Sequence, residues 1–293
     1  MVLPTIENPL GLPLWFACLI MGIFGAIIGS FLNVVIHRVP REQSIVLPES
    51  ACPSCRAPIK AYDNIPIISY LILRGRCRGC GAKISARYPL VEALTGLLFA
   101  AVTWHDGLSF ALAFDLAFTA SIVALIFIDA EHMILPNVIT YPGILFALIT
   151  RIVVPYLAGP ARFDDLPHLQ SLLPQYPVWL VSLIGAALGA LAGGGSLWVM
   201  GFLWEKLRGV EAMGFGDVKM MLMVGAFLGW RLTILTILIA AFSGSLAGIA
   251  MMVRRGGRNL QMMLPFGIFL GIGSLVSLLV GTQIIDWYAS QFR

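Results

Sequence analysis

Charge-free stretches recur along the 293 residues of this chain. No Asp, Glu, Lys or Arg occurs in residues 8–36, 169–204, 232–253 or 259–285. A helix needs about 20 apolar residues to cross the hydrocarbon core of a bilayer, and each stretch is long enough. The pattern therefore predicts four transmembrane helices in these regions.

Three weaker apolar stretches are each interrupted by one ionisable residue. They are 89–104 with Glu92, 108–128 with Asp115, and 138–158 with Arg151. We interpret these three as transmembrane helices as well. An eighth segment, 218–230, is short, since 11 residues separate Lys219 from Arg231. At about 1.5 Å per residue it can cross only if its ends snorkel or the bilayer thins.

The positions of Lys and Arg decide between two topologies. A single helix over 218–253 would place Arg231 in the middle of the membrane and move the arginines of 254–258 away from the basic loop at 37–88. Counting 218–230 separately puts 15 of the 19 Lys and Arg on the cytoplasmic side, as the positive-inside rule requires. We expect an all-α polytopic membrane protein of about eight helices, with both termini outside.

Composition supports a membrane protein and narrows its partners. Hydrophobic residues make up 59% of the chain and charged residues 12%, with mean hydropathy +0.90, whereas soluble proteins have about 25% charged residues. The net charge of +4 reflects the basic cytoplasmic face, which predicts contact with anionic lipids and not with nucleic acid. The first apolar segment lacks a basic n-region and a cleavage site, so we interpret it as a retained helix.

Four of the five cysteines form two CxxC pairs, separated by 21 residues. Each CxxC turn can bring two thiolates to one tetrahedral ion, at about 2.3 Å per bond. The spacing predicts a structural zinc site, because four cysteines leave no open position for water. Two disulfides are the alternative, which a reducing cytoplasm disfavours. The predicted ligands are Cys52, Cys55, Cys77 and Cys80, while Cys18 is interpreted as a small buried apolar residue.

Two aspartates at membrane boundaries are the candidate catalytic residues, because ionisable groups at membrane depth are costly. Asp129 ends the third predicted helix, and Asp217 opens the sixth within GFGDVK at 214–219. In aspartic proteases one carboxylate takes a proton from water and a second polarises the scissile carbonyl. Gly214 and Gly216 would allow an extended substrate to approach the backbone closely.

Simpler interpretations of these carboxylates stay open at this point. A lone GxGD motif can reflect helix packing in a chain with 30 glycines. Asp129 can be an interfacial charge paired with His132 or Lys219. Asp115 lies towards the outer end of the third predicted helix, and we interpret it as structural or pore-facing.

The helix ends predict different roles for the two aspartates. Asp129 lies where exposed carbonyls disfavour negative charge, and Asp217 lies where free amides favour it. Lys219 would strengthen this bias if it faces the site. The resulting hypothesis is that Asp217 is the ionised base and Asp129 the protonated acid, although a helix end contributes only about 0.3–1 kcal/mol.

The motifs, taken together and in order, resemble the type IV prepilin peptidase family of GxGD aspartic membrane proteases. The matching segments are GSFLNVVIHRVP at 29–40, the CPxC pair, YDNIP at 62–66, RGRC at 74–77, SARYPLVE at 85–92, GFGDVK at 214–219 and LPFG at 264–267. The chain departs from the family pattern at Ile268, where a second proline is common, and at Asn137, where many members carry aspartate. We expect neither departure to touch the two carboxylates.

The resemblance implies an enzyme that cuts the basic leader from type IV prepilins or type II secretion pseudopilins, after a glycine on the cytoplasmic side. It also implies methylation of the new N-terminus with S-adenosylmethionine, with Asp129 and Asp217 as the protease pair. No glycine-rich signature marks a methyl-donor site. Around Pro265 and Gly267 the backbone could hold a substrate strand, although a proline that simply begins a helix is the alternative.

We therefore expect a first transmembrane helix at 1–36, a cytoplasmic zinc module at 37–88 and a transmembrane peptidase domain at 89–293. The expected location is the bacterial inner membrane, with prepilins and lipids as partners. Two other classes are weighed against this interpretation. Other GxGD intramembrane proteases, presenilin-like or preflagellin peptidases, do not account for the zinc module. A zinc-bearing transporter should show internal repeats, and the halves of this chain show no self-similarity.

Overall fold

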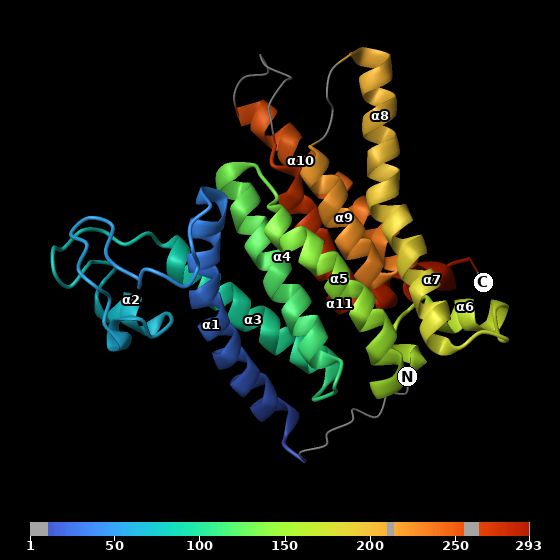
Figure 1. Cartoon of the computed structure of the whole chain (residues 1–293), viewed down its shortest axis with the longest axis horizontal. Helices are drawn as coiled ribbons and strands as arrows, with labels where there is room; N and C mark the ends of the chain where they lie inside the picture. The colour runs from blue at the N-terminus through green and yellow to red at the C-terminus, as the bar shows by residue number, and fades with distance from the viewer. Residues whose placement is uncertain (1–10, 210–213, 255–263, 293) are drawn as a thin grey trace. The chain divides into compact units, whose positions relative to one another are not determined.

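The computed structural model describes residues 11–209, 214–254 and 264–292, which are mostly helical (Figure 1). The chain divides after Ala124 into two compact units. The only β-structure in the described ranges consists of two isolated bridges, between Ala51 and Pro58 and between Arg76 and Lys83. The chain is thus all-α in class, as the charge-free stretches predict.

The first unit is built on two closely packed helices, α1 (Leu14–Arg38) and α3 (Arg87–Asp106). Between them lie the short helices η1 (Val39–Arg41), η2 (Ala61–Asp63) and α2 (Ile68–Ile72). A Cβ atom on Gly25 would lie 2.7 Å from Phe99 Cβ, and one on Gly29 would lie 2.7 Å from Glu92 Cα. Glycine at these positions lets the two backbones touch, which is how apolar helices associate where water supplies no driving force.

The remaining helices begin with α4 (Leu112–His132), which contains the division between the units. Those that follow it are α5 (Asn137–Leu157), η3 (Pro160–Arg162), α6 (Leu166–Leu172), α7 (Val178–Ala190), the π-helical turn η4 (Leu191–Gly195), α8 (Ser196–Arg208), α9 (Phe215–Leu228), α10 (Trp230–Arg254) and α11 (Phe266–Ser290). Helix α9 is the core of the second unit and contacts α5, α7, η4, α8, α10 and α11. Its residues Met220, Met221 and Val224 are fully buried.

Within the described ranges, six helical segments are long and apolar enough to cross a membrane. They are Leu14–Arg41, Leu112–His132, Asn137–Leu157, Val178–Arg208, Trp230–Arg254 and Phe266–Ser290. Helices α3 and α9 exist as the sequence predicts, but they are not among the six. The predicted count of about eight is therefore supported for six spans only, because α3 is less apolar and α9 has just 14 residues.

Two predicted boundaries were tested by the fold. Helix α9 is separate from α10, as predicted, because Gly229 between them has a φ of 85° that ends the helix. The predicted helix over 169–204 is wrong at its start. The chain forms α6 at Leu166–Leu172, and α7 begins only after Pro177, because Pro174 and Pro177 lack the amide hydrogens that a helix interior needs.

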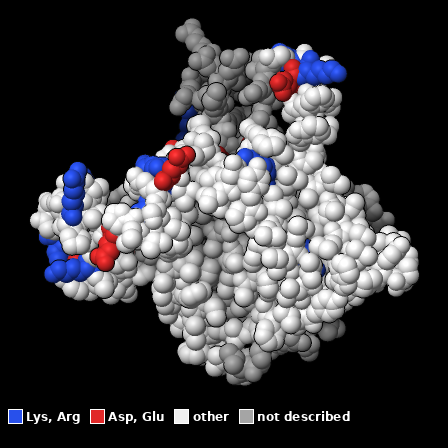
Figure 2. Space-filling view, in the orientation of Figure 1, with Lys and Arg blue, Asp and Glu red and all other residues white. Residues whose placement is uncertain are grey.

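The surfaces of the long helices are apolar. Figure 2 shows broad areas without charge, while Lys, Arg, Asp and Glu gather in a few places. Large apolar side chains such as Phe242, Val253 and Trp198 are more than half exposed. Apolar side chains exposed over so many helices would be costly in water and are stable in contact with lipid.

Candidate active site and metal centre

The two candidate aspartates lie within the second unit, Asp129 at the carboxyl end of one helix and Asp217 at the amino end of another. Asp129 is in the last turn of α4 and is 5% exposed. Asp217 is in the first turn of α9, three residues after the N-cap Gly214, and its amide donates to the Gly214 carbonyl at 3.1 Å. Asp129 is near enough to Asp217 for the two carboxyl groups to influence each other's charge.

Leu135 lies at the point where three segments of this site meet. A Cβ atom on Gly216 would lie 3.1 Å from Leu135 Cβ, and one on Gly267 would lie 3.2 Å from Leu135 Cδ1. The same Gly267 Cβ would lie 2.8 Å from Asp129 Oδ2. The start of α9, the start of α11 and the end of α4 therefore converge around one leucine, with glycine wherever the backbone approaches most closely.

Ile268 orients the Asp129 carboxylate. Its amide, in the first turn of α11, donates a hydrogen bond of 3.1 Å to Asp129 Oδ2. The expectation that position 268 does not touch the carboxylates is therefore wrong. A proline at this position would have no hydrogen to donate.

Lys219 bonds away from the aspartates, to Asn137 Oδ1 at the start of α5. Its Nζ also lies 5.6 Å from the centre of the Tyr141 ring and 5.2 Å from that of Phe215. Asn137, the second departure from the family pattern, thus fixes the start of α9 through Lys219. Its influence on Asp217 is indirect, and the proposed strengthening of the Asp217 charge by Lys219 finds no support in these contacts.

The other predicted residues take simpler positions. Asp115 lies in the first turn of α4, 14 residues before Asp129 and so about 21 Å away along the helix. His132 Nε2 is 4.0 Å from the carboxylate of Glu131. Pro265 is the N-cap of α11, which agrees with the alternative interpretation that this proline begins a helix. Both Pro265 and Pro136 begin a helix after a leucine, and this repeated Leu-Pro is the sequence signal that could have located Leu135 and Ile268 near the site.

The four cysteines of the two CxxC pairs come together in the first unit. Their Sγ atoms all lie within 4.8 Å of one another. Cys52 Sγ is 3.9 Å from Cys80 Sγ, and Cys55 Sγ is 4.0 Å from Cys77 Sγ. Tetrahedral zinc–sulfur bonds place sulfur atoms about 3.8 Å apart, whereas a disulfide is about 2.0 Å long. All five cysteines are free, so the arrangement fits one tetrahedral metal ion and not two disulfides.

The two CxxC pairs lie in two separate backbone turns of the same kind. The Cys52 amide donates to Ala57 O at 2.9 Å, and the Cys77 amide donates to Ala82 O at 2.8 Å. The residue after the second cysteine has positive φ in both turns, 56° at Arg56 and 71° at Gly81. The two turns are therefore one local structure used twice, and each presents its thiols from a short loop.

The thiols of Cys52 and Cys80 differ in how readily they ionise. Hydrogen bonds from the Cys55 and Ser54 amides lower the pKa of the Cys52 thiol to about 6. At Cys80 the Ala82 amide favours the thiolate, but the neighbouring thiols and burial outweigh it and raise the pKa to about 11. A shared cation is what would allow all four to ionise together.

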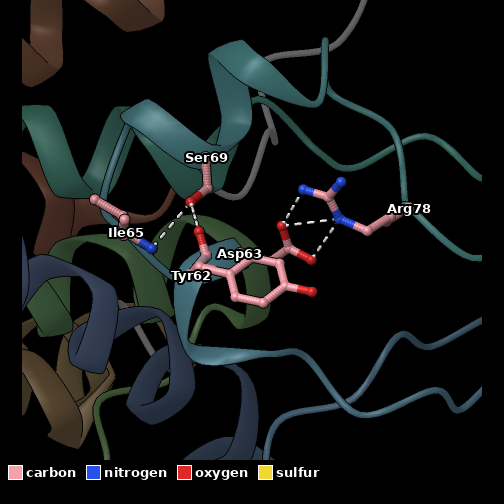
Figure 3. Close-up of polar contacts among 5 residues, drawn as sticks. All are labelled: Tyr62, Asp63, Ile65, Ser69 and Arg78. Carbon is pink, nitrogen blue, oxygen red and sulfur yellow. Dashed lines mark hydrogen bonds and ion pairs between the residues drawn. The ribbon is translucent and has the colours of Figure 1, made fainter.

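Figure 3 shows how the segment between the two turns is held. Arg78, within the second turn, donates three hydrogen bonds to Asp63, two from Nε at 2.9 and 3.1 Å and one from Nη2 at 2.6 Å. Its guanidinium lies 5.5 Å from the centre of the Tyr62 ring. This hydrogen bonding holds the pKa of Asp63 below its usual value. Ser69 Oγ accepts from the Ile65 amide and donates to Tyr62 O, each at 3.0 Å. The YDNIP motif thus joins α2 to the second cysteine turn.

Two family models match this chain. A family model described as the bacterial peptidase A24 N-terminal domain matches residues 23–106, and one described as the type IV leader peptidase family matches residues 116–249. The cysteine cluster falls within the first match, and Asp129 and Asp217 fall within the second.

Curated relatives extend the similarity to nearly the whole chain. A protein of Aeromonas hydrophila is 37% identical, with 96% of this chain and 97% of the relative covered. One of Pseudomonas aeruginosa is 34% identical with 98% of each covered, and one of Neisseria gonorrhoeae is 37% identical with 82% and 84% covered. All three are named "Prepilin leader peptidase/N-methyltransferase". No solved structure matches this chain.

Proposed function

This chain belongs to the type IV leader peptidase family, and on that basis we propose that it removes leader peptides from prepilins or pseudopilins by a two-aspartate mechanism. Cleavage is proposed to occur after a glycine at the cytoplasmic face. The observation that carries the proposal is that Gly216, next to Asp217, and Gly267, beside the Asp129 carboxylate, both pack against Leu135, while the Ile268 amide donates to Asp129.

The proposed reaction needs no group beyond water and the two carboxyls. One carboxylate takes a proton from water, and the resulting hydroxide adds to the scissile carbonyl carbon. The other, protonated carboxyl donates its proton towards the carbonyl oxygen. When the tetrahedral intermediate collapses, the C–N bond breaks, the leader keeps the new carboxylate and the mature chain keeps the amine, which takes up a proton.

We assign the base role to Asp217 and the acid role to Asp129. The amino end of α9 favours negative charge at Asp217, and the carboxyl end of α4 disfavours it at Asp129. The Ile268 amide acts in the opposite sense, because a donated hydrogen bond stabilises an ionised carboxylate. Infrared bands of the two carboxyls, identified by Asp→Asn substitution in the resting enzyme, distinguish the assignments. An ionised Asp129 beside a protonated Asp217 would reverse them.

We further propose that the cysteine cluster holds a structural zinc ion and that the enzyme methylates the new N-terminus. The fit of four Sγ atoms to a tetrahedral ion supports zinc. The names of the curated relatives support methyl transfer. S-adenosylmethionine would supply the methyl group to the new amine, and no residue of this chain is assigned to its binding.

The test is mass spectrometry of a prepilin co-expressed with the enzyme, which reads leader removal and N-methylation from one spectrum. Asp129→Asn and Asp217→Asn should each abolish cleavage while the protein still inserts and binds zinc, because the substitution keeps side-chain shape and removes the ionisable group. Asp115→Asn is the control that should remain active. Substantial cleavage by either active-site variant would exclude the mechanism.

A further inference from the structure

Two ion pairs meet where α9 ends, at the opposite end of that helix from Asp217. Arg151 of α5 is fully buried, and its Nη1 lies 2.8 Å from Asp165 Oδ1. Arg231 of α10 places Nη1 3.1 Å from Asp164 Oδ2. The two adjacent aspartates precede α6, so one short segment binds arginines from two different helices. We call these four residues the double ion pair.

Arg151 also contacts α9 directly. Its Nε donates a hydrogen bond of 3.1 Å to the carbonyl oxygen of Ala226, in the last turn of α9, and its guanidinium stacks over the Phe163 ring at 4.1 Å. The final carbonyls of a helix have no partner within the helix. In apolar surroundings an unpaired carbonyl is costly, so Arg151 gives the end of α9 a polar partner that lipid cannot provide.

The backbone is shaped around this contact. A Cβ atom on Gly229, where α9 ends, would lie 2.5 Å from Arg151 Nη2. One on Gly185 of α7 would lie 2.5 Å from Asp165 Oδ2. Neither position has room for a side chain, so the pair is enclosed by α7 and by the break between α9 and α10.

The length of α9 gives the double ion pair a consequence for the active site. With 14 residues, α9 is about 21 Å long, less than the roughly 30 Å of a bilayer core, so it cannot reach polar surroundings at both ends. Its first turn carries Asp217, and a helix transmits an axial shift from one end to the other. Asp129 is bound separately, through α11, so the axial position of α9 sets how the two carboxyls face each other.

We propose that the double ion pair fixes the axial position of α9, which makes Arg151 and Asp165 positioning residues for peptide cleavage. The inference rests on the proposed function. It differs from a purely stabilising role, because replacing a buried ion pair with apolar side chains of similar size is often neutral for stability. Such a replacement would preserve folding and still leave the Ala226 carbonyl without its partner.

The experiment uses the full chain in proteoliposomes with a purified prepilin. The main variant is the double substitution Arg151→Met with Asp165→Leu. Arg151→Lys is the second, because lysine keeps the charge opposite Asp165 but lacks the planar fork that also reaches Ala226. Arg208→Met is the matched control, since this exposed arginine lies on α8 and stacks on Trp204. For each, kcat, KM, zinc content and thermal stability are measured, together with the carboxyl infrared band that Asp217→Asn removes.

We expect the double variant to fold and bind zinc, with kcat lowered about 10- to 100-fold and KM unchanged, since a misplacement of about 1 Å can have that effect. The Asp217 band should shift, Arg151→Lys should change both readouts in the same direction by less, and Arg208→Met should match wild type. A double variant with wild-type kcat and an unshifted band would overturn the proposal. So would a loss of activity that only follows the unfolded fraction.

Arg151→Lys alone decides the question if the double variant does not insert. A lowered kcat with a shifted band supports the proposal, and wild-type values for both overturn it. Failure of the wild-type enzyme to cleave prepilin would instead contradict the proposed function, and the Asp217 band would still report whether the ion pair positions α9.

Discussion

Single residues at the active site act through backbone contacts as much as through their side chains. Ile268 has an apolar side chain, yet its amide is what binds Asp129. Gly267 matters because a Cβ atom there would meet the Asp129 carboxylate. Neither effect depends on the chemical type of a side chain, which is why a search for reactive residues does not find them.

Replacing Ile268 with proline tests the amide contact. Proline is tolerated in the first turn of a helix, where its missing hydrogen has no intrahelical partner, so α11 should still form. We expect Ile268→Pro to lower kcat for prepilin cleavage by up to about tenfold, the range of one hydrogen bond to an uncharged group such as the protonated carboxyl assigned to Asp129. Ile268→Val keeps the amide and should leave kcat unchanged. Equal rates for both variants would show that this contact does not orient Asp129.

A Cβ atom at position 267 tests the close packing. Gly267→Ala places a methyl group 2.8 Å from Asp129 Oδ2 and 3.2 Å from Leu135 Cδ1, so the start of α11 or the carboxylate must move. Cleavage should fall by more than in Ile268→Pro, by about 10- to 100-fold. The matched control is Gly248→Ala on α10, whose Cβ would meet nothing closer than 3.7 Å. Normal kinetics for Gly267→Ala would show that the site relaxes without cost.

At the scale of elements, the cysteine turns and α2 form a small unit tied to α3. The Ile67 amide donates to Glu92 Oε2 at 2.7 Å, and Ile67 adopts a φ of 62° within a tight turn closed by a 2.6 Å bond from the Ile68 amide to Pro66 O. A β-branched residue in this conformation is strained by about 1–3 kcal/mol. The Glu92 carboxylate is therefore used as an anchor, which explains why an ionisable residue lies within a predicted apolar stretch.

Loss of this anchor should release the loop at 37–88. We expect Glu92→Ala to increase proteolytic cleavage of the loop, because the Ile67 amide loses its acceptor and the strained turn loses the bond that holds it. Glu92→Gln retains an oxygen acceptor and should be close to wild type. Limited proteolysis with fragment mass determination measures both. Wild-type resistance of Glu92→Ala would show that α2 is held by other contacts.

Metal binding to the cysteine turns should release protons. At pH 7 the Cys52 thiol, with its pKa of about 6, is already mostly ionised, whereas Cys80, with its pKa of about 11, still holds its proton. Zinc binding must displace that proton, so affinity should rise with pH between about 6 and 11 and fall as acid protonates the thiolates. Calorimetry of zinc uptake in buffers of different ionisation enthalpy counts the protons released.

Substitution of the cysteines completes this test. Cys80→Ser should remove tight zinc binding, while Cys18→Ser should leave zinc content unchanged, because Cys18 lies on α1 outside the cluster. Metal content of the purified proteins decides this. Full zinc content in Cys80→Ser, or disulfides found after non-reducing digestion, would contradict a four-cysteine zinc site.

At the scale of the whole molecule, the number and direction of the membrane crossings determine on which side of the membrane each loop lies. In the part of the chain that the structure describes, six helices qualify as spans by length and apolar content, and counting α3 and α9 as two more gives the eight that we propose. An even number with both termini outside would put the loop at 37–88 in the cytoplasm and the segment at 159–176 on the other side. Burial of α9 among six elements explains how so short a helix can persist in a membrane.

Epitope tags inserted at two exposed loop positions test this arrangement. In spheroplasts, where the outer membrane no longer excludes antibody, a tag after Gln175 should be reached directly, and a tag after Gln43 only after the inner membrane is permeabilised. The physical basis is the concentration of Lys and Arg in 37–88, which resists translocation. Two tags found on the same side of the membrane would contradict the eight-helix topology. Cleavage of prepilin by each tagged protein is the control for correct folding.

The sequence by itself determined the all-α class, most of the helices, the separate α9, the cysteine cluster and the two candidate aspartates. The length of the charge-free stretches, the distribution of Lys and Arg, and the CxxC spacing can each be read along the chain without knowing how the helices pack. The family resemblance rests on the same segments and is confirmed by the matching family models and curated relatives.

Only the tertiary structure decided which distant groups meet. The burial of Arg151 against Asp165, the turn of Lys219 towards Asn137 and the donation from Ile268 to Asp129 join residues 14, 82 and 139 positions apart. Charge alone showed that Arg151 interrupts a span and that Lys219 lies two residues from Asp217, but a side chain's partner depends on how helices pack. That packing is set by close backbone contacts at glycines, such as Gly189 against Gly225, whose effect is invisible until the helices are brought together.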